Sequence, residues 1–271
     1  MLKLNTIAFN KQSECNHTSM SKIFYLTVSF LLLTNVAKSQ SNLTYQLERL
    51  PEAIRMDGSV DDLGWQSIPV VPMVMHEPSF GENPDELSIV KISYDDNYLY
   101  VAGEFHYSDT KNIRTNSLYR DRYSNGDNFS ILIDPFNDNE NGLRFFVNPE
   151  GVRFDEAISS DAEAPGESFL NSSWNTFWSV KTKPQPQGWS MEMRIPFSSL
   201  GLNTNNPDLE IGLIVSRRIV AGNRRYVFPA IPPDWSFATI KPSQAYDVSL
   251  SNVKTGNPVY ITPYMTGGIN S

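Results

Sequence analysis

The tryptophans are the side chains of this sequence with the clearest chemical use. Trp174 and Trp235 each lie in polar, loop-like sequence rich in Ser, Asn, Asp and Pro. An indole ring offers a flat apolar face, on which the axial C–H groups of a pyranose sugar pack while its hydroxyls reach polar neighbours. For these two residues a sugar platform and a core position are equal alternatives. Trp178 is a third candidate platform, although, as for Trp65 and Trp189, the apolar strand pattern around it favours the core.

Arg120 is the candidate polar partner of these rings. It follows Tyr119 and precedes a polar turn, Ser124-Asn125-Gly126-Asp127. A guanidinium is a planar fork of donors that suits vicinal hydroxyls or a carboxylate. The alternative is a surface ion pair with Asp121 or Asp127, which contributes little to stability. The residues alone leave both interpretations open.

An acidic segment, residues 134–141, reads Asp-Pro-Phe-Asn-Asp-Asn-Glu-Asn. Hard oxygen ligands at this density can hold calcium, and Asp134, Asp138 and Asn139 are the candidate ligands of a structural calcium ion, although the segment by itself favours a turn. The spacing differs from that of an EF-hand, which places a glutamate at its twelfth position. The alternative is a hairpin turn held by Asp and Asn side chains.

Other active-site chemistries have weaker signals. His76 and His106 are the only histidines after residue 39, and neither has the His-x-x-x-His spacing of a zinc site. The sequence has no Gly-x-Ser-x-Gly nucleophile elbow and no glycine-rich phosphate loop. A Ser-His-Asp triad and a pair of carboxylates for glycoside hydrolysis need only proximity in space, so both stay open.

The charge of the chain limits its partners. The net charge is −8 and the sequence pI is about 4.9. Such a surface repels the phosphates of nucleic acid and of anionic lipid. A neutral partner such as a glycan, or a cation such as calcium, suits it better.

The start of the chain predicts export. Lys22 precedes a short apolar run over residues 23–33, and Ala37-Lys38-Ser39 supplies a small-x-small cleavage pattern, so we expect cleavage after Ser39. The alternative is a buried helix or an uncleaved anchor. Residues 1–19 are polar, and we interpret Met20 as the true start of the signal peptide. Because the single cysteine, Cys15, lies upstream, the mature chain has no thiol, which suits an oxidising compartment.

Alternation with a period of two residues dominates the rest of the chain. It predicts strands over residues 90–94, 99–107, 129–133, 145–147, 152–158, 189–195, 211–215 and 245–250, with short helical turns at 61–66 and 197–200. Many short strands with polar turns are typical of an all-β, antiparallel β-sandwich or barrel. Residues 159–173 form the most loop-like insertion, and loops of this kind often carry the binding function of a sandwich.

Four segments, in this order along the chain, together resemble family 9 carbohydrate-binding modules over about residues 50–250. They are Ile54-Arg55-Met56-Asp57-Gly58-Ser59-Val60-Asp61-Asp62-Leu63-Gly64-Trp65, Ile92-Ser93-Tyr94-Asp95-Asp96-Asn97-Tyr98-Leu99-Tyr100-Val101, Asp127-Asn128-Phe129-Ser130-Ile131-Leu132-Ile133-Asp134 and Gly188-Trp189-Ser190-Met191-Glu192-Met193-Arg194-Ile195-Pro196-Phe197. The resemblance implies a jelly-roll or immunoglobulin-like β-sandwich, a clamp of two tryptophans around a terminal sugar, and structural calcium. It also favours a binding role for Arg120.

A narrower resemblance is to modules that precede a membrane β-barrel in large bacterial outer-membrane proteins. Arg120-Asp121, residues 134–138 and residues 146–152 carry it, and residues 259–268 are similar to a first barrel strand. We therefore divide the chain into an N-terminal extension and signal peptide (1–39), a family 9-like sandwich (40–251), and a linker with a candidate first strand of a truncated barrel (252–271).

These observations predict a non-catalytic polysaccharide-binding module of an exported bacterial protein. We expect it in the periplasm or outer membrane of a Gram-negative cell, or secreted. The expected partner is a glycan, bound by stacking on Trp174 and Trp235, with Arg120 as polar partner and Trp178 as the further candidate. Two alternatives stay open: a glycoside hydrolase or a fragment of one, and a periplasmic interaction domain of an outer-membrane barrel.

Overall fold

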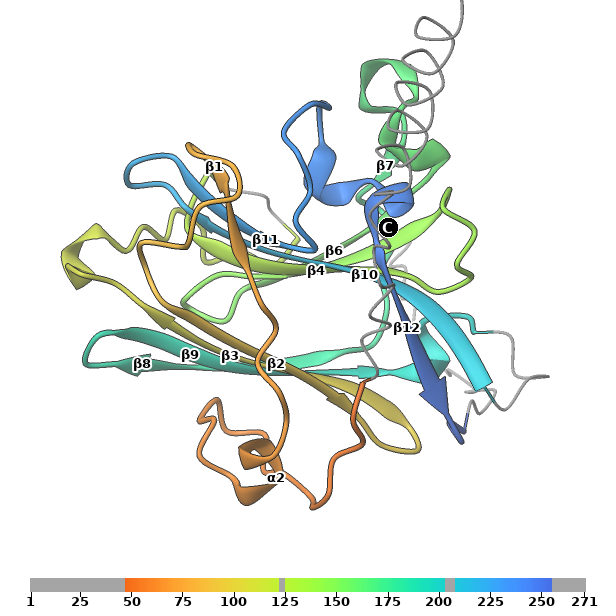
Figure 1. Ribbon diagram of the computed structural model, residues 1–271, viewed down its shortest axis with the longest axis horizontal. Coiled ribbons are helices and arrows are strands. Elements are labelled where there is room, and N and C mark those ends of the chain that lie inside the picture. Colours follow the sequence, from red (N-terminus) through yellow and green to blue (C-terminus); the bar gives the residue numbers. More distant parts are fainter. Residues whose placement is uncertain (1–46, 122–124, 203–207, 255–271) are drawn as a thin grey trace, which may run out of the picture. The chain divides into compact units, whose positions relative to one another are not determined.

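The computed structural model describes residues 47–121, 125–202 and 208–254. Two antiparallel sheets face each other and form a β-sandwich, which confirms the predicted fold class (Figure 1). The predicted signal peptide and residues 255–271 lie outside the described residues, so the division of the chain stays a prediction. In the described part of the chain, no helix has the length and apolar character needed to span a membrane.

The larger sheet has its strands in the order β1-β11-β10-β4-β5-β6-β7, and β12 also pairs with β10. Their bounds are β1 Val74–Glu77, β4 Asn128–Asp134, β5 Gly142–Val147, β6 Arg153–Ile158, β7 Leu170–Asn171, β10 Asp208–Ile219, β11 Arg224–Phe228 and β12 Tyr246–Ser251. The smaller sheet has the order β2-β3-β9-β8, with β2 Ser88–Tyr94, β3 Tyr98–His106, β8 Ser179–Gln185 and β9 Gly188–Pro196. The predicted helical turns are present as α2 (Leu63–Gln66) and the 3-10 turn η4 (Phe197–Ser199).

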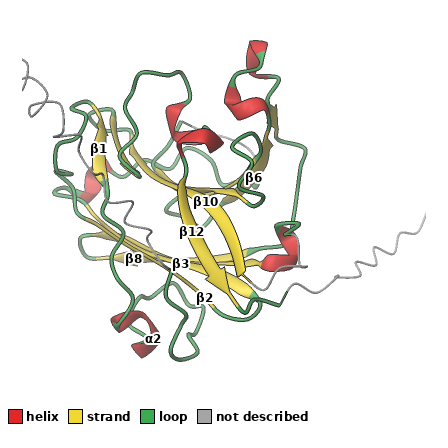
Figure 2. Ribbon diagram, turned by 45° about the vertical axis from the view of Figure 1, so that its right-hand side comes forward, coloured by secondary structure: helices red, strands yellow, loops and turns green. Residues whose placement is uncertain are grey.

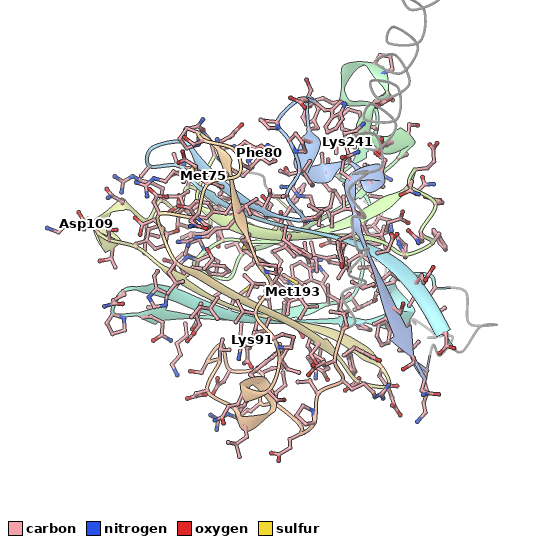
Figure 3. All side chains as sticks on the ribbon, viewed as in Figure 1. Met75, Phe80, Lys91, Asp109, Met193 and Lys241 are labelled. Carbon is pink, nitrogen blue, oxygen red and sulfur yellow. The ribbon has the colours of Figure 1, made fainter. Side chains whose placement is uncertain are left out.

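The main core lies between the two sheets, where the alternating residues of each strand meet. On β4, Ile131 and Ile133 face this core, and from the smaller sheet Met193 reaches it (Figure 3). Leu132, between them in sequence, faces the other side of the larger sheet and joins a second cluster with Ile214. Since side chains alternate across a strand, the larger sheet buries apolar side chains on both of its faces. Loops cover the face that is turned away from the smaller sheet.

The outer face of the smaller sheet is covered by the segment that precedes β1. Trp65 packs there and is fully buried, which confirms its predicted core position. Its Nε1 donates a hydrogen bond of 3.0 Å to the carboxylate of Glu192, which also accepts 2.9 Å bonds from the backbone N–H groups of Asp57 and Gly58. The first and the fourth of the segments quoted above are therefore joined through the buried carboxylate of Glu192.

Position 58 requires glycine because of this close contact. Its φ is +87°, and a Cβ atom at this position would lie 2.9 Å from the backbone carbonyl carbon of Thr182. An L-residue would therefore be strained and crowded against β8. The glycine brings the turn near enough for its N–H group to reach Glu192.

Arg217 on β10 joins the two sheets at one end of the sandwich. It is fully buried, and its guanidinium donates to the carbonyl oxygens of Leu87 (2.9 Å) and His106 (2.7 Å) and to Oγ of Ser88 (2.8 Å). Three aromatic rings surround it, those of Phe105, Tyr107 and Tyr226, at 4.7–5.7 Å from Cζ to the ring centroid. These acceptors belong to the smaller sheet and its flanking turns, so one side chain ties both sheets together.

Candidate functional site

An open hollow lies on the outer side of the larger sheet. Two segments form it: residues 159–169, between β6 and β7, and residues 229–245, between β11 and β12. Figure 2 shows their short helical turns on the same side of that sheet, away from the smaller one. The hollow has a volume of about 490 Å³ and is lined by Ala162, Glu163, Ala164, Gly166, Glu167, Phe169, Trp235, Ser236, Phe237 and Lys241. We call it the Trp235 hollow.

The rings of Trp235 and Phe237 form its apolar wall. Trp235 is 42 % exposed and Phe237 is 41 % exposed. Phe237 is anchored edge-on against the buried ring of Phe169, with ring centroids 5.1 Å apart. Phe237 also has a φ of 60°, a left-handed conformation that a bulky residue adopts only under constraint from its surroundings. Two large, partly exposed rings that line one hollow are a platform that a ligand could cover.

The polar rim of the hollow comes from charged side chains. The Glu163 side chain is well exposed and accepts from Nζ of Lys241 at 2.7 Å. Burial by itself lowers the pKa of Lys241, but the ion pairs with Asp161 and Glu163 outweigh burial and leave that pKa raised. Lys241 is therefore a permanent cation at neutral pH. Apolar rings with a few placed polar groups are typical of small-ligand sites.

Trp178 is a core residue, so its candidacy as a sugar platform was wrong. Only 5 % of it is exposed, and its ring packs edge-on against Phe145 with centroids 5.4 Å apart. Its Nε1 donates to the buried carboxylate of Asp155 at 3.1 Å. With its flat faces buried and its only donor bonded, Trp178 has no surface to offer a sugar.

Trp174 and Trp235 do not form one clamp. Trp174 is half-buried and packs against the main core between the sheets, where its ring meets Phe145 at 6.0 Å. Trp235 lies with Phe169 and Phe237, beside the cluster on the outer face of the larger sheet. Because the sheet separates the two environments, one pyranose cannot contact both rings.

Arg120 lies near Trp174 and Trp178, not at the Trp235 hollow. It forms the predicted ion pair with Asp121, at 3.1 Å, and also contacts buried Asp155 at 3.4 Å. Its shortest hydrogen bond, 2.6 Å, goes to Oδ1 of Asn175. Asp155 accepts in addition from the backbone N–H of Thr176 at 2.8 Å. These contacts fix residues 174–178 against β6, while a binding role for the exposed part of Arg120 stays a prediction.

The acidic segment after β4 has the geometry of an Asp-and-Asn turn. The buried Asp134 carboxylate accepts from the backbone N–H groups of Phe136 (3.2 Å), Asp138 (3.3 Å) and Asn139 (2.8 Å), and burial leaves its pKa raised. Asp138 in turn accepts from the N–H groups of Glu140 and Asn141. Among the described residues no group of three His, Cys, Asp or Glu side chains is placed to hold a metal. These hydrogen bonds hold the segment as a turn, and calcium binding by Asp134, Asp138 and Asn139 stays a prediction.

The histidines are bonded to amide groups. Nδ1 of His76 lies 2.9 Å from the carbonyl oxygen of Ile231, and Nδ1 of His106 lies 3.2 Å from Oε1 of Gln187. In a Ser-His-Asp triad this nitrogen is bonded to the carboxylate. The contacts of both residues therefore differ from those of a triad.

Sequence reasoning found part of the Trp235 hollow. It singled out Trp235 and, separately, the loop-like insertion of residues 159–173, and the structure brings them together. It missed Phe237, although an aromatic residue two positions from Trp235 in the same polar segment was a usable signal. It also missed Lys241, whose partners lie about 80 positions earlier in the chain.

Neither a family model nor a curated protein sequence matches the chain. Solved structures do match. A candidate carbohydrate-binding protein from Bacteroides uniformis has 10 % identity and a TM-score of 0.59, covering 75 % of this chain and 97 % of its own. A family 9 carbohydrate-binding module from Caldicellulosiruptor kristjanssonii in complex with glucose has 18 % identity and a TM-score of 0.51, covering 80 % and 98 %. A family 9 module from the same organism in complex with cellotriose has 18 % identity and a TM-score of 0.49, covering 80 % and 100 %. At these identities the common property is the fold, and this chain has a β-sandwich like that of a family 9 carbohydrate-binding module.

Proposed function

We propose that this chain is a non-catalytic carbohydrate-binding module whose glycan site is the Trp235 hollow. The observation that carries the proposal is the partly exposed ring of Trp235, which lines an open hollow together with Phe237 and a polar rim. The likeness in fold to a module solved with glucose supports it, as do the four sequence segments that resemble family 9 modules.

The proposed binding mode combines stacking with hydrogen bonds from hydroxyls. The apolar C–H face of a sugar covers Trp235, with Phe237 as the neighbouring wall. The carboxylates of Glu163 and Glu167 are acceptors for hydroxyl groups at the rim. The open shape of the hollow suits a chain of sugars that continues beyond the stacked unit.

Trp235→Ala tests this proposal. We expect the variant to lose about 2 kcal/mol or more of binding free energy, a roughly thirtyfold weaker affinity, because the platform area is lost. Its melting temperature should stay close to that of the parent, since the ring is 42 % exposed. The measurements are a glycan-array screen of residues 40–251, followed by calorimetry with an oligosaccharide that binds.

Two further variants make the result specific. Phe80 is 41 % exposed but lies outside the hollow, so Phe80→Ala should leave the affinity unchanged. Trp178→Ala should instead lower stability by about 3–5 kcal/mol, as expected for a large core residue. A Trp235→Ala variant that binds as tightly as the parent would place the glycan elsewhere, and one that melts like Trp178→Ala would make Trp235 a core residue.

We further propose that the module is exported and serves glycan recognition at a bacterial envelope. The support is the apolar run over residues 23–33 with the cleavage pattern Ala37-Lys38-Ser39, and the resemblance of residues 259–268 to a barrel strand. Both segments lie outside the described residues. Cell fractionation tests export, and a chain found only in the cytoplasm would contradict it. N-terminal sequencing of the exported protein tests cleavage after Ser39, and a chain that retains residues 23–33 would contradict that prediction.

A further inference from the structure

One wall of the Trp235 hollow has a strained backbone. Ser160, Asp161 and Ala162 follow one another with φ values of 54°, 49° and 57°, all in the left-handed region. For an L-residue this conformation is unfavourable because Cβ crowds the following carbonyl oxygen, and runs of it are rare because the costs add. No glycine relieves the turn. Such backbone persists only where the surrounding contacts over-determine it, and it is concentrated at functional sites.

Lys241 supplies those contacts. Its side chain is 4 % exposed, and its Nζ lies 2.8 Å from Oδ2 of Asp161, 2.9 Å from the carbonyl oxygen of Asp161 and 2.7 Å from Oε1 of Glu163. The ammonium has three N–H donors, and three oxygens on both sides of Ala162 surround it. A buried cation without these partners would be strongly destabilising, so the turn and the lysine hold each other in place.

Ser243 completes the connection from the same segment. Its backbone N–H donates to Oδ1 of Asp161 at 2.9 Å, and its hydroxyl donates to Oδ2 at 2.7 Å. The N–H of Asp161 is bonded to the carbonyl oxygen of Glu140 at 2.9 Å. Both oxygens of the Asp161 carboxylate are therefore directed toward residues 241–243. We call Lys241, Ser243, Asp161 and Glu163 the clasp.

The clasp joins the two walls of the hollow. Lys241 belongs to the segment that carries Trp235 and Phe237, and it is bonded to the segment that carries Ala162 and Glu163. Figure 3 places Lys241 on the outer side of the larger sheet, beside the short helical turns of these segments. Its three bonds set the separation between the aromatic wall and the Glu163 carboxylate.

We propose that Lys241 is a positioning residue for glycan binding, which holds the 160–163 turn so that Glu163 faces the Trp235 platform at a fixed spacing. The proposal rests on the function proposed above and extends it, because it assigns the shape of the site to a residue that need not touch the sugar. A pre-formed site avoids the entropy cost of ordering a loop when the ligand binds.

The first test needs no glycan. Lys241→Met keeps the length of the side chain and removes the ammonium, and hydrogen exchange of the whole chain reports on each segment. We expect faster exchange at the N–H groups of residues 159–169 in this variant, with the β-strands of both sheets unchanged. The matched control is Lys254→Met, which removes an exposed ion pair with Asp96 at 2.6 Å and should leave residues 159–169 unchanged. Equal exchange of these residues in parent and Lys241→Met would overturn the clasp.

The second test measures the affinity for an oligosaccharide that binds the parent on the array. The measurement is made well below the melting temperature of each variant. We expect Lys241→Met to bind roughly tenfold more weakly than the parent. Lys241→Arg should recover most of the lost affinity because it restores a cation. Ser243→Ala removes one hydrogen bond to Asp161 without a change of charge, so it replaces Lys241→Met as the test variant if Lys241→Met folds poorly. Its expected loss of affinity is smaller. A loosened turn with unchanged affinity would make Lys241 a structural residue only and overturn the positioning role.

The two tests separate the proposals. If the parent binds no oligosaccharide, the proposed function fails and the positioning role fails with it, while the exchange data still decide whether the clasp holds the turn. If the parent binds and Trp235→Ala does not, but Lys241→Met binds like the parent, the function stands and the role of Lys241 is wrong.

Discussion

Arg217→Met is expected to lower the free energy of unfolding by about 3–5 kcal/mol, because it removes the charge-bearing partner from a buried polar network. Methionine fills much of the space of the arginine stem, so the change in the free energy of unfolding reflects the missing guanidinium interactions and not a cavity. Without the guanidinium, the carbonyl oxygen of His106 and Oγ of Ser88 lose this donor, while the carbonyl oxygen of Leu87 keeps its bond from the N–H of His106 at 3.0 Å. Each group left unsatisfied costs about 1–3 kcal/mol. The contact of the cation with three aromatic rings is lost as well.

Urea denaturation of parent and variant measures this effect. Arg218 is the matched control: it is the next residue on β10, faces the other side of the sheet and is only half-buried. We expect Arg218→Met to change stability by less than about 1 kcal/mol, as for most partly exposed positions. If the two variants unfold at the same urea concentration, Arg217 does not connect the sheets in the way described.

Glu192→Ala is expected to cost about 3 kcal/mol or more. The substitution leaves the N–H groups of Asp57, Gly58 and Trp65 without their common acceptor beneath the segment that covers the smaller sheet. Glu104 lies on the neighbouring strand and shares the outer face of that sheet, so Glu104→Ala is the control and should be nearly neutral. Chemical denaturation checks both, and near-equal midpoints for the two variants would contradict the prediction.

The pH dependence of Glu192 has a definite sign. Burial raises its pKa from the ordinary value of 4.5, and the hydrogen bonds from Trp65, Gly58 and Asp57 only partly oppose this. The folded state therefore takes up this proton at a higher pH than the unfolded state. The resulting contribution to stability is complete below the ordinary pKa and is lost as the pH rises through the folded pKa. Measured against the non-titrating Glu192→Gln variant, the parent should gain stability as the pH falls through that range.

The fold was predictable because its signal is local. Alternation over residues 90–94 and 99–107 marks a hairpin by itself, and the Asp95 carboxylate closes its turn by accepting from the N–H groups of Asn97 and Tyr98. Each such pattern involves neighbours in sequence. The tertiary arrangement of the sheets followed from the general rule that one apolar face must meet another.

The candidate site was predictable only in part, because its contacts are distant in sequence. The two indoles of Trp174 and Trp235 have the same kind of polar flanking sequence, yet one packs against the main core and the other lines the hollow. Nothing near Lys241 indicates that its charge is paired with Asp161. The oxygen-rich segment at Asp134 has the composition of a calcium site, and composition could not show that its carboxylate oxygens also accept from backbone N–H groups.

The late position of β11 and β12 has a consequence for synthesis of the protein on the ribosome. β1 is an early strand of the larger sheet, yet its partner is β11, and Val74 pairs with Val227. Pairing over so many residues delays completion of the sheet and slows folding. The wall that carries Trp235 lies between β11 and β12, so it emerges from the ribosome among the last parts of the sandwich. Under the proposed function, a nascent or truncated chain that ends before residue 229 could not capture a glycan, because it lacks both the Trp235 platform and Lys241, which holds the turn opposite it.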